Sequence, residues 1–340
     1  MVEKGKYGYF DQEKREYVVT EPKTPTPWIN YLGDGEYGGI VSNTGGGYSF
    51  DCDPRYKRVL RYRYNSIPED QPGRYIYIRD DETGEVWSAT WQPVKAEYDQ
   101  YKCRHGLGYT VISQQHSGIN SEVTYFVPTG KKMEFWWLKL KNNSTRPRKL
   151  SIFSYAEFCF FDAVKDQQNV DWVQQIQQGD YEDGFIFWNA FMKTWEYIFF
   201  TANQPAHSFD TSRERFIGRY RDLSLPLAVE NGECGNSLAR RGNGVGALCH
   251  KFVLPPNGEE EVVYALGVTA EKEQCKAEVK PICRPEVVRD LFMDLHNYWE
   301  RFLASLQVET AEPAVNLLLN TWNPYQCKTT FNWSRFVSLY

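Results

Sequence analysis

The sequence predicts a mainly β fold in three parts: a large antiparallel sandwich, a helical connector and the first helix of an all-α domain. Short runs with strand-like alternation, separated by turn residues, recur through residues 1–270, and this spacing favours a large antiparallel sandwich. Beyond residue 271 the apolar residues recur at helical spacing instead. We therefore expect a sandwich in residues 1–270, a helical linker in residues 271–310 and the start of an all-α domain in residues 311–340.

The composition favours a β-rich carbohydrate protein. The chain has 340 residues, which suggests about two domains. Its aromatic share of 16% is high, and aromatic side chains favour strands and also form platforms on which sugar rings stack. Aromatic sheet cores are the plainer explanation for most of them. The net charge of -5, without a basic stripe, argues against a nucleic-acid partner.

Targeting and redox signals indicate a cytoplasmic protein without a membrane partner. No apolar run approaches eighteen residues, and the N-terminus shows no signal peptide. The eight cysteines include no CxxC pair, so we interpret them as free thiols in a reducing cytosol.

The strands of the sandwich are predicted from alternation and turn residues. Strand-like runs occupy residues 7–10, 16–20, 61–64, 74–78 and 123–127. Further segments are a proline-rich extended stretch (24–33) and a glycine loop that feeds a strand (42–50).

The clearest hairpin is predicted over residues 133–158. There Trp136 and Leu138 alternate with lysines, so one sheet face is expected to be buried and the other wet, and residues 142–144 turn the chain. A second turn-linked pair of strands is expected at residues 251–266.

Helical spacing dominates the last seventy residues. Residues 285–303 predict an amphipathic helix that begins near Pro285. A break at residues 310–313 precedes the terminal helix.

In the terminal stretch, two apolar sets lie eighteen residues apart, a whole number of helical turns, and are expected to share a face: Val315, Leu318, Leu319 and Trp322, then Trp333, Phe336, Val337 and Tyr340. That face carries polar Gln326 and Thr329 between the sets, and Pro324 removes the hydrogen bond that the Asn320 carbonyl would accept. A helix of this kind is either kinked or lines a site. We expect the chain to be part of something larger, with its chemistry partly elsewhere.

The sequence contains no HExxH, Walker or GxSxG motif. The five histidines are far apart and lack metal-ligand spacing, so no metal site is expected. Residues 157–169 leave a strand and become a loop dense in carboxylates, amides and aromatics, which suits sugar hydroxyls. For these residues, a lid that binds sugar and an ordinary loop are equally compatible with the sequence. A complete catalytic site is not expected, because nothing pairs the carboxylates as acid and base.

Several motifs together resemble, in chain order, the inverting β-glucoside phosphorylases of glycoside hydrolase family 94, which include cellobiose, cellodextrin, laminaribiose and chitobiose phosphorylases. These motifs lie at residues 7–11, 26–33, 46–50, 61–65, 104–109, 126–128, 156–159, 215–218 and 322–326.

The resemblance implies an N-terminal β super-sandwich, a helical linker, an (α/α)6 barrel that holds the active site, and a small C-terminal β domain. It also implies homodimers in which the sandwich of one subunit helps wall the active site of the other. The implied reaction is phosphorolysis: an Asp protonates the glycosidic oxygen while inorganic phosphate attacks the anomeric carbon from the opposite face, which gives α-glucose 1-phosphate. Phosphate is then a co-substrate, and no cofactor is expected.

The resemblance also implies where the site residues lie. The general-acid Asp and the phosphate-binding residues of the family lie beyond the position of Tyr340, so we expect no catalytic residue here and an inactive isolated chain. Arg335 matches the arginine that binds the donor sugar, although a surface helix arginine is its ordinary alternative, and Gln326 is expected to bind substrate. A lid over the partner's active site is expected from Phe161, Asp162, Asp166, Gln168, Asn169 and Tyr48.

Two hypotheses of different classes follow. The first is the N-terminal portion of a family 94 phosphorylase, as a fragment or as one chain of a split or nicked enzyme. The split-enzyme form expects Trp333 and Phe336 to pack against a second polypeptide and not to fold back on the sandwich. The second is a non-catalytic carbohydrate-binding or interaction module. Residues 226–237 resemble the chitobiose enzymes and residues 322–326 the glucoside ones, and we favour a β-glucoside substrate.

Overall fold

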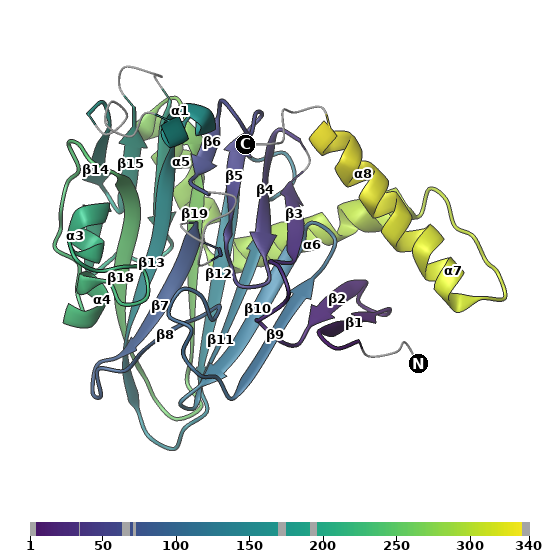
Figure 1. Cartoon of the computed structure of the whole chain (residues 1–340), viewed down its shortest axis with the longest axis horizontal. Coiled ribbons are helices and arrows are strands. Elements are labelled where there is room, and N and C mark those ends of the chain that lie inside the picture. Colours follow the sequence, from purple (N-terminus) through teal and green to yellow (C-terminus); the bar gives the residue numbers. More distant parts are fainter. Residues whose placement is uncertain are drawn as a thin grey trace.

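Two large antiparallel sheets face each other and helices follow them, which confirms the predicted mainly β fold (Figure 1). The computed structural model describes residues 5–33, 35–62, 69–70, 73–168, 175–190 and 196–334. The order of the first sheet is β1 (Gly8–Asp11), β2 (Glu16–Val19), β9 (Gln100–His105), β10 (Tyr109–His116), β11 (Ile119–Phe126), β12 (Met133–Asn142), β19 (Glu259–Thr269), β16 (Tyr197–Ala202), β15 (Phe185–Asn189) and β14 (Gln178–Glu182).

The second sheet faces the first across the main core. Its order is β17 (Ser208–Ser212), β18 (Gly244–Leu254), β13 (Arg148–Phe161), β6 (Arg58–Leu60), β5 (Gly47–Asp51), β4 (Tyr37–Ser42) and β3 (Ile29–Gly33), with β7 (Arg74–Asp80) on β13 and β8 (Val86–Ser88) on β7. Large side chains such as Trp87, Trp136 and Trp188 are fully buried in this core. Short helices cap the second sheet: α1 (Ala163–Gln168), α3 (Arg213–Ile217) and α4 (Leu227–Asn231). The strand predicted at residues 61–64 lies earlier, at β6, and residues 63 and 64 are outside the described residues.

A second core lies on the outer face of the first sheet, under α5 (Lys272–Ile282) and α6 (Pro285–Leu303). The predicted amphipathic helix is confirmed as α6, and its Leu295 and Trp299 are buried in this core. The expected solvent-exposed face of β12 is present only near its C-terminal end, at Lys139 and Lys141. Trp136 faces the inner core and Trp137 the helices, because α6 covers the outer face there.

The predicted hairpins are wrong in their pairing. β12 pairs with β11 and β19, whereas β13 pairs with β18, β7 and β6. Likewise β18 and β19 belong to different sheets. Both turns therefore carry the chain from one sheet to the other. A polar turn between two alternating runs looks the same in sequence whether the chain folds back in one sheet or crosses to the next.

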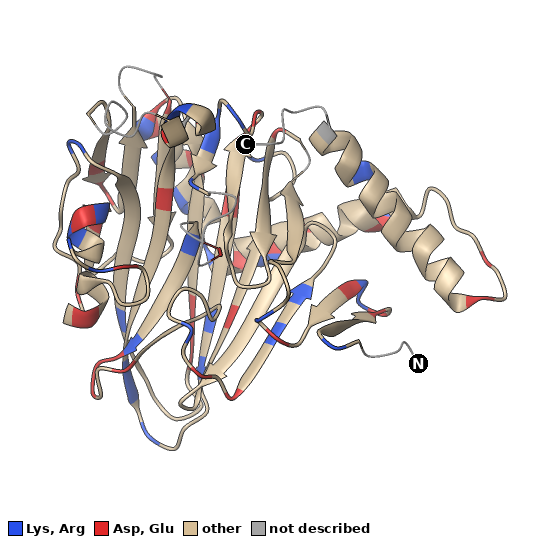
Figure 2. Cartoon of the chain, in the orientation of Figure 1, with Lys and Arg blue, Asp and Glu red and all other residues tan. Residues whose placement is uncertain are grey.

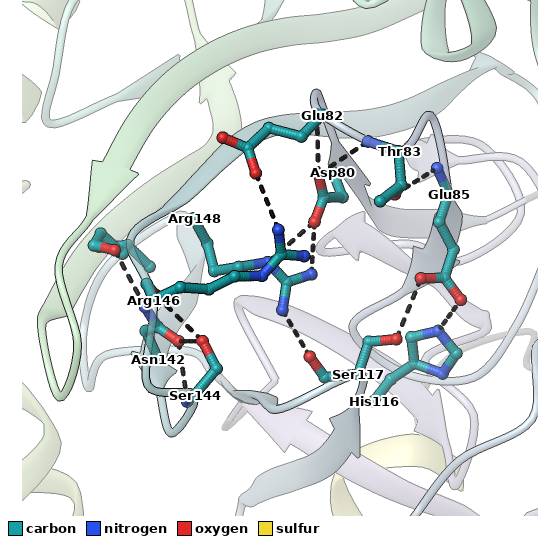
Figure 3. A network of polar contacts seen from close by, with 11 residues as sticks. Asp80, Glu82, Thr83, Glu85, His116, Ser117, Asn142, Ser144, Arg146 and Arg148 are labelled. Carbon is teal, nitrogen blue, oxygen red and sulfur yellow. Dashed lines mark hydrogen bonds and ion pairs between the residues drawn. The ribbon is translucent and has the colours of Figure 1, made fainter.

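The two crossover turns lie side by side, and the buried side chain of Asn142 joins them. Its Nδ2 is 2.8, 3.0 and 3.1 Å from the carbonyl oxygens of Arg146, Leu254 and Pro255. In the same corner Arg148 forms a buried ion pair with Asp80 (Figure 3). These contacts hold both sheets at one end of the sandwich.

Replacing Asn142 by Ala is expected to lower the free energy of unfolding by about 2 kcal/mol, because buried carbonyl groups lose their donor. Urea unfolding of N142A measures this loss. The matched control is Asn143→Ala in the same turn, where the side chain is exposed and a change below about 0.5 kcal/mol is expected. Equal losses in the two variants would contradict the role of Asn142.

The terminal helix is interrupted by a π-helical turn. It consists of α7 (Pro313–Leu317), the π turn η1 (Leu318–Trp322) and α8 (Asn323–Ser334). Figure 1 shows α7 and α8 as an arm beside the sandwich. The first of the two predicted apolar sets does not lie on one buried face: Trp322 contacts the sandwich, while Val315, Leu318 and Leu319 are exposed. Of the second set, Trp333 contacts the sandwich, and Phe336, Val337 and Tyr340 lie outside the described residues. A π turn holds more residues than an α turn, so an eighteen-residue spacing does not keep its face across it.

Trp333 also corrects the expectation of a second polypeptide. Its ring is half-buried against Tyr31 and Phe50 of the same chain. Phe336, the other residue of that expectation, lies outside the described residues.

Candidate functional site

The arm that carries the predicted sugar-binding residues is attached to the sandwich through a polar contact. The hydroxyl of Tyr325 on α8 lies 2.8 Å from Asn30 Oδ1 on β3 and accepts the Gly108 N–H at 3.3 Å. The Nδ2 of Asn30 donates to the carbonyl oxygens of Gly106 and Tyr109, each at 2.7 Å. Three motifs that are far apart in the sequence (26–33, 104–109 and 322–326) therefore meet at one point.

An aromatic cluster holds the far end of α8. The ring centroid of Trp333 lies 4.9 Å from Tyr31, 5.1 Å from Phe50 and 6.3 Å from Tyr48. Tyr48 in turn lies under the guanidinium of buried Arg58, whose Cζ is 4.0 Å from the ring centroid. The predicted lid residue Tyr48 is thus buried beside the C-terminal end of α8, where its ring packs near Trp333.

One stripe of α8 faces the sandwich, and the residues on the opposite side are mostly exposed. Tyr325 and Thr329 are buried and Trp333 is half-buried, whereas Gln326 is exposed. The exposed amide of Gln326 is accessible to a ligand, so its predicted role in substrate binding stays a prediction. Arg335, one residue beyond the end of α8, lies outside the described residues.

The predicted lid begins with α1, which an ion network fixes to the sandwich. Arg61 donates to both carboxylate oxygens of Asp166, from Nε at 2.8 Å and from Nη2 at 2.5 Å, and from Nη1 to Glu157 at 2.8 Å. Asp162 is buried too, and its Oδ1 accepts the N–H of Lys165 in the first turn of α1. Buried and paired, Asp162 and Asp166 hold α1 in place and are not available to an outside sugar.

Among the other predicted lid residues, Gln168 at the end of α1 is exposed. The side chain of Phe161 and the whole of Asn169 lie outside the described residues. A lid role for these three residues stays a prediction.

Glu157 is the centre of this network and remains ionised. Burial raises its pKa, but the charges of Arg213 and Arg61 outweigh burial and keep the pKa below its usual range. Tyr155 and Arg213 donate to its second oxygen, Arg213 at 3.0 Å. A carboxylate held in this way is a poor general acid, because it does not carry a proton near neutral pH.

A cleft that the sequence did not predict lies beside this network, above α3. Its volume is about 1120 Å³ and its lining includes Arg213, Arg219, Arg221, Arg240 and Arg241. Figure 2 shows positively and negatively charged residues together at α3. Four of these arginines form ion pairs, with Glu157, Glu214, Glu230 and Asp180. The cleft is therefore largely neutralised, and we assign it no ligand. Its signals in the sequence were the arginine-rich run at residues 213–221 and the adjacent Arg240 and Arg241.

The described residues contain no group of three His, Cys, Asp or Glu side chains that could hold a metal ion. Cys103 and the seven other cysteines are free thiols. None of the helices in the described part of the chain has the length and apolar character needed to cross a membrane.

Two family models match the chain. The model "Glycosyl hydrolase 94, supersandwich domain" covers residues 15–285, and "Glycosyl hydrolase 94 superfamily, catalytic domain" covers residues 298–340.

Curated relatives match over nearly the whole chain. The N,N'-diacetylchitobiose phosphorylase of Vibrio furnissii is 38% identical over 98% of this chain and 42% of its own length. The N,N'-diacetylchitobiose phosphorylase of Vibrio proteolyticus is 37% identical over the same shares. The 3-O-beta-D-glucopyranosyl-beta-D-glucuronide phosphorylase of Paenibacillus borealis is 30% identical over 93% of this chain and 40% of its own length. The chain thus spans about two fifths of the length of these relatives.

Proposed function

This chain belongs to glycoside hydrolase family 94, and on that premise we propose that it is the N-terminal portion of a phosphorylase that cleaves a β-linked disaccharide with inorganic phosphate. The observation that carries the proposal is the order of the two family matches, a supersandwich followed by the beginning of a catalytic domain. The relatives described above are phosphorylases of β-linked disaccharides, which supports the same reaction class.

In the proposed reaction, a carboxylic acid donates its proton to the glycosidic oxygen as the bond from that oxygen to the anomeric carbon breaks. A phosphate oxygen bonds to the same carbon from the opposite face, so the product is an α-sugar 1-phosphate. Phosphate is itself the nucleophile, so no general base and no further cofactor is needed. We assign the acid to an Asp beyond Tyr340, and sugar binding to Gln326 and Arg335.

The division into domains at residues 1–270, 271–310 and 311–340 is part of the proposal. Three boundaries of the structure support it. The last strand ends at Thr269, α5 begins at Lys272, and α7 begins at Pro313.

We further propose that the rest of the catalytic domain covers the exposed side of the arm. Three apolar side chains there are 38% to 49% exposed: Val315, Leu318 and Leu319. Figure 2 shows that the arm has few charged residues, and Lys328 is the only charged residue between positions 313 and 334. An apolar, nearly uncharged helix surface of this kind favours burial against other protein. The same proposal includes a homodimer, as the resemblance implies, and a cytoplasmic location, which the free cysteines favour.

The test compares the 340-residue chain with the same chain continued by a complete catalytic domain. Each is incubated with disaccharide, with phosphate or with sulfate in its place, and sugar 1-phosphate is measured. We expect phosphate-dependent release from the continued chain and none above background from the isolated chain. Release by the isolated chain would place the acid among these 340 residues and refute that assignment. Micromolar binding of cello-oligosaccharides by the isolated chain, with no turnover in the continued one, would favour a binding module.

The same assay decides the donor sugar. Cellobiose and N,N'-diacetylchitobiose differ at the 2-position of the donor ring, where a hydroxyl or an acetamido group must fit. Our sequence-based preference is the β-glucoside, whereas two of the relatives described above are named for diacetylchitobiose. Turnover of cellobiose at least tenfold faster than of diacetylchitobiose is the result that this preference expects, and the reverse order contradicts it.

A further inference from the structure

The contact between Tyr325 and Asn30 has only one arrangement of donors and acceptors. Asn30 is buried, and both protons of its Nδ2 are used by the carbonyl oxygens of Gly106 and Tyr109. Its Oδ1 must therefore face α8, where it can only accept a hydrogen bond. Tyr325 supplies the proton, because its hydroxyl already accepts from the Gly108 N–H and is 2.8 Å from Oδ1, nearer than the Tyr31 carbonyl oxygen at 3.4 Å.

The loop at residues 106–109 lies in space between Asn30 and Tyr325. It can approach the helices this closely only because residue 108 is glycine. Gly108 has a φ of +75°, and a Cβ at this position would lie 2.9 Å from Nε1 of Trp299 on α6. The ring centroid of Trp299 is 5.0 Å from that of Tyr325. The loop is thus held between α6 and α8, and it links the sandwich, the linker helix and the arm.

The π turn η1 directs α8 toward this loop. Val315, Leu318 and Leu319 are exposed. Trp322, the last residue of the π turn, contacts the sandwich, and so do Tyr325 and Trp333 after it. An irregular turn is less stable than a regular α-helical one, and π turns frequently occur at functional sites. Its consequence here is that Tyr325 points inward and the neighbouring Gln326 outward.

From this geometry we propose that Asn30 and Tyr325 form a latch through which the sandwich sets the position of α8, and thereby of Gln326, the proposed sugar-binding side chain on α8. Tyr325 and Asn30 are positioning residues and touch no substrate. The consequence for substrate binding rests on the proposed function, whereas the latch itself does not.

Hydrogen–deuterium exchange on the 340-residue chain tests the latch. Tyr325→Phe removes only the hydroxyl and leaves Asn30 Oδ1 and the Gly108 N–H buried without their partner. We expect amides of α8 to exchange roughly tenfold faster, with unchanged rates in β10 and β11. The matched control is Tyr298→Phe on α6, because no hydrogen bond of its hydroxyl is found among the described residues. Unchanged exchange in α8, or an equal increase in α8 and the sandwich, would overturn the latch.

A double-mutant comparison separates the latch from general loosening. If Asn30 and Tyr325 act on α8 through each other, the two substitutions share one effect. The fold-increase in α8 exchange in the double variant Asn30→Ala/Tyr325→Phe is then clearly smaller than the product of the two single fold-increases. Effects that multiply would show that the two residues act independently.

The positioning role is tested in the chain continued by a complete catalytic domain. There Tyr325→Phe is expected to raise KM for the disaccharide severalfold while the thermal midpoint of the sandwich stays unchanged. An unchanged KM beside faster α8 exchange would refute positioning and leave the latch intact. No phosphorolysis by the unmutated enzyme would refute the proposed function, and the exchange result on the isolated chain would still stand.

Discussion

Acidification from pH 7 to pH 5 is expected to remove about 4 kcal/mol of folding stability through two buried histidines, His105 and His250. Burial lowers the pKa of each from 6.5 to about 4, against the hydrogen bonds that their Nε2 atoms make to the carbonyl oxygens of Trp28 and Gln204.

Because the folded-state pKa lies below the unfolded one, the unfolded chain takes up protons first. The stability that the histidines contribute is therefore fully present above pH 6.5 and is lost as the pH falls toward 4. At about 1.36 kcal/mol per pH unit, the 1.5 units between 6.5 and 5 correspond to about 2 kcal/mol for each histidine. Asp70 and Asp210, whose pKa burial raises, act in the opposite direction, so the histidine contribution has to be measured as a difference.

Urea unfolding at pH 7 and pH 5 measures that difference. The variant H105Q/H250Q cannot take up these protons, so its loss between the two pH values is expected to be about 4 kcal/mol smaller than that of the unmodified chain. His250→Gln alone gives about half of the effect and serves if the double variant does not fold. His207→Gln, at an exposed position, is the control and should leave the pH dependence unchanged. A double variant as acid-sensitive as the original chain would contradict the prediction.

Replacing Arg61 by Met is expected to lower the free energy of unfolding by about 3–5 kcal/mol. Arg61 is buried and is the shared partner of Glu157 and Asp166, which are buried as well. Methionine fills a similar volume but leaves two carboxylates without this cation, and breaking a buried ion pair from one side typically has an effect of this size. Because Asp166 lies on α1, we also expect this helix to detach first.

Denaturant unfolding measures the total loss, and proteolysis near α1 measures the local one. The control is Arg146→Met, which removes an ion pair with Glu82 in which both side chains are well exposed. Exposed pairs contribute about 0–1 kcal/mol, so R146M should be nearly silent. A loss below about 1 kcal/mol in R61M would show that the network is dispensable.

Local sequence patterns determined the types of element. The alternation at residues 133–142 and the helical spacing at residues 285–303 follow from periods of 2 and 3.6 residues, which neighbouring residues impose by themselves. β12 and α6 accordingly occupy the predicted segments. The order of the motifs indicated the family, because a short sequence motif can be recognised without knowing where the fold places it.

Only the tertiary structure decided which strands pair, because pairing depends on where the chain goes after a turn. Neither the crossing from β12 to β13 nor that from β18 to β19 leaves a local signal. The predicted lid shows the same limit. A segment rich in Asp, Gln and aromatic residues suits sugar hydroxyls or an internal ion network equally well, and a partner more than a hundred residues away, Arg61, decided the matter for Asp166.

For the terminal helix, too, the sequence determined one feature and the tertiary structure another. The sequence by itself predicted a terminal helix disturbed near Pro324, because a proline lacks the N–H that a regular helix needs, and the described residues 313–334 form such an interrupted helix. Which face of that helix is inside depended on the π turn and on Asn30, 295 residues before Tyr325. A hydrogen bond across such a separation exists only once the sandwich has formed, so no local pattern could predict it.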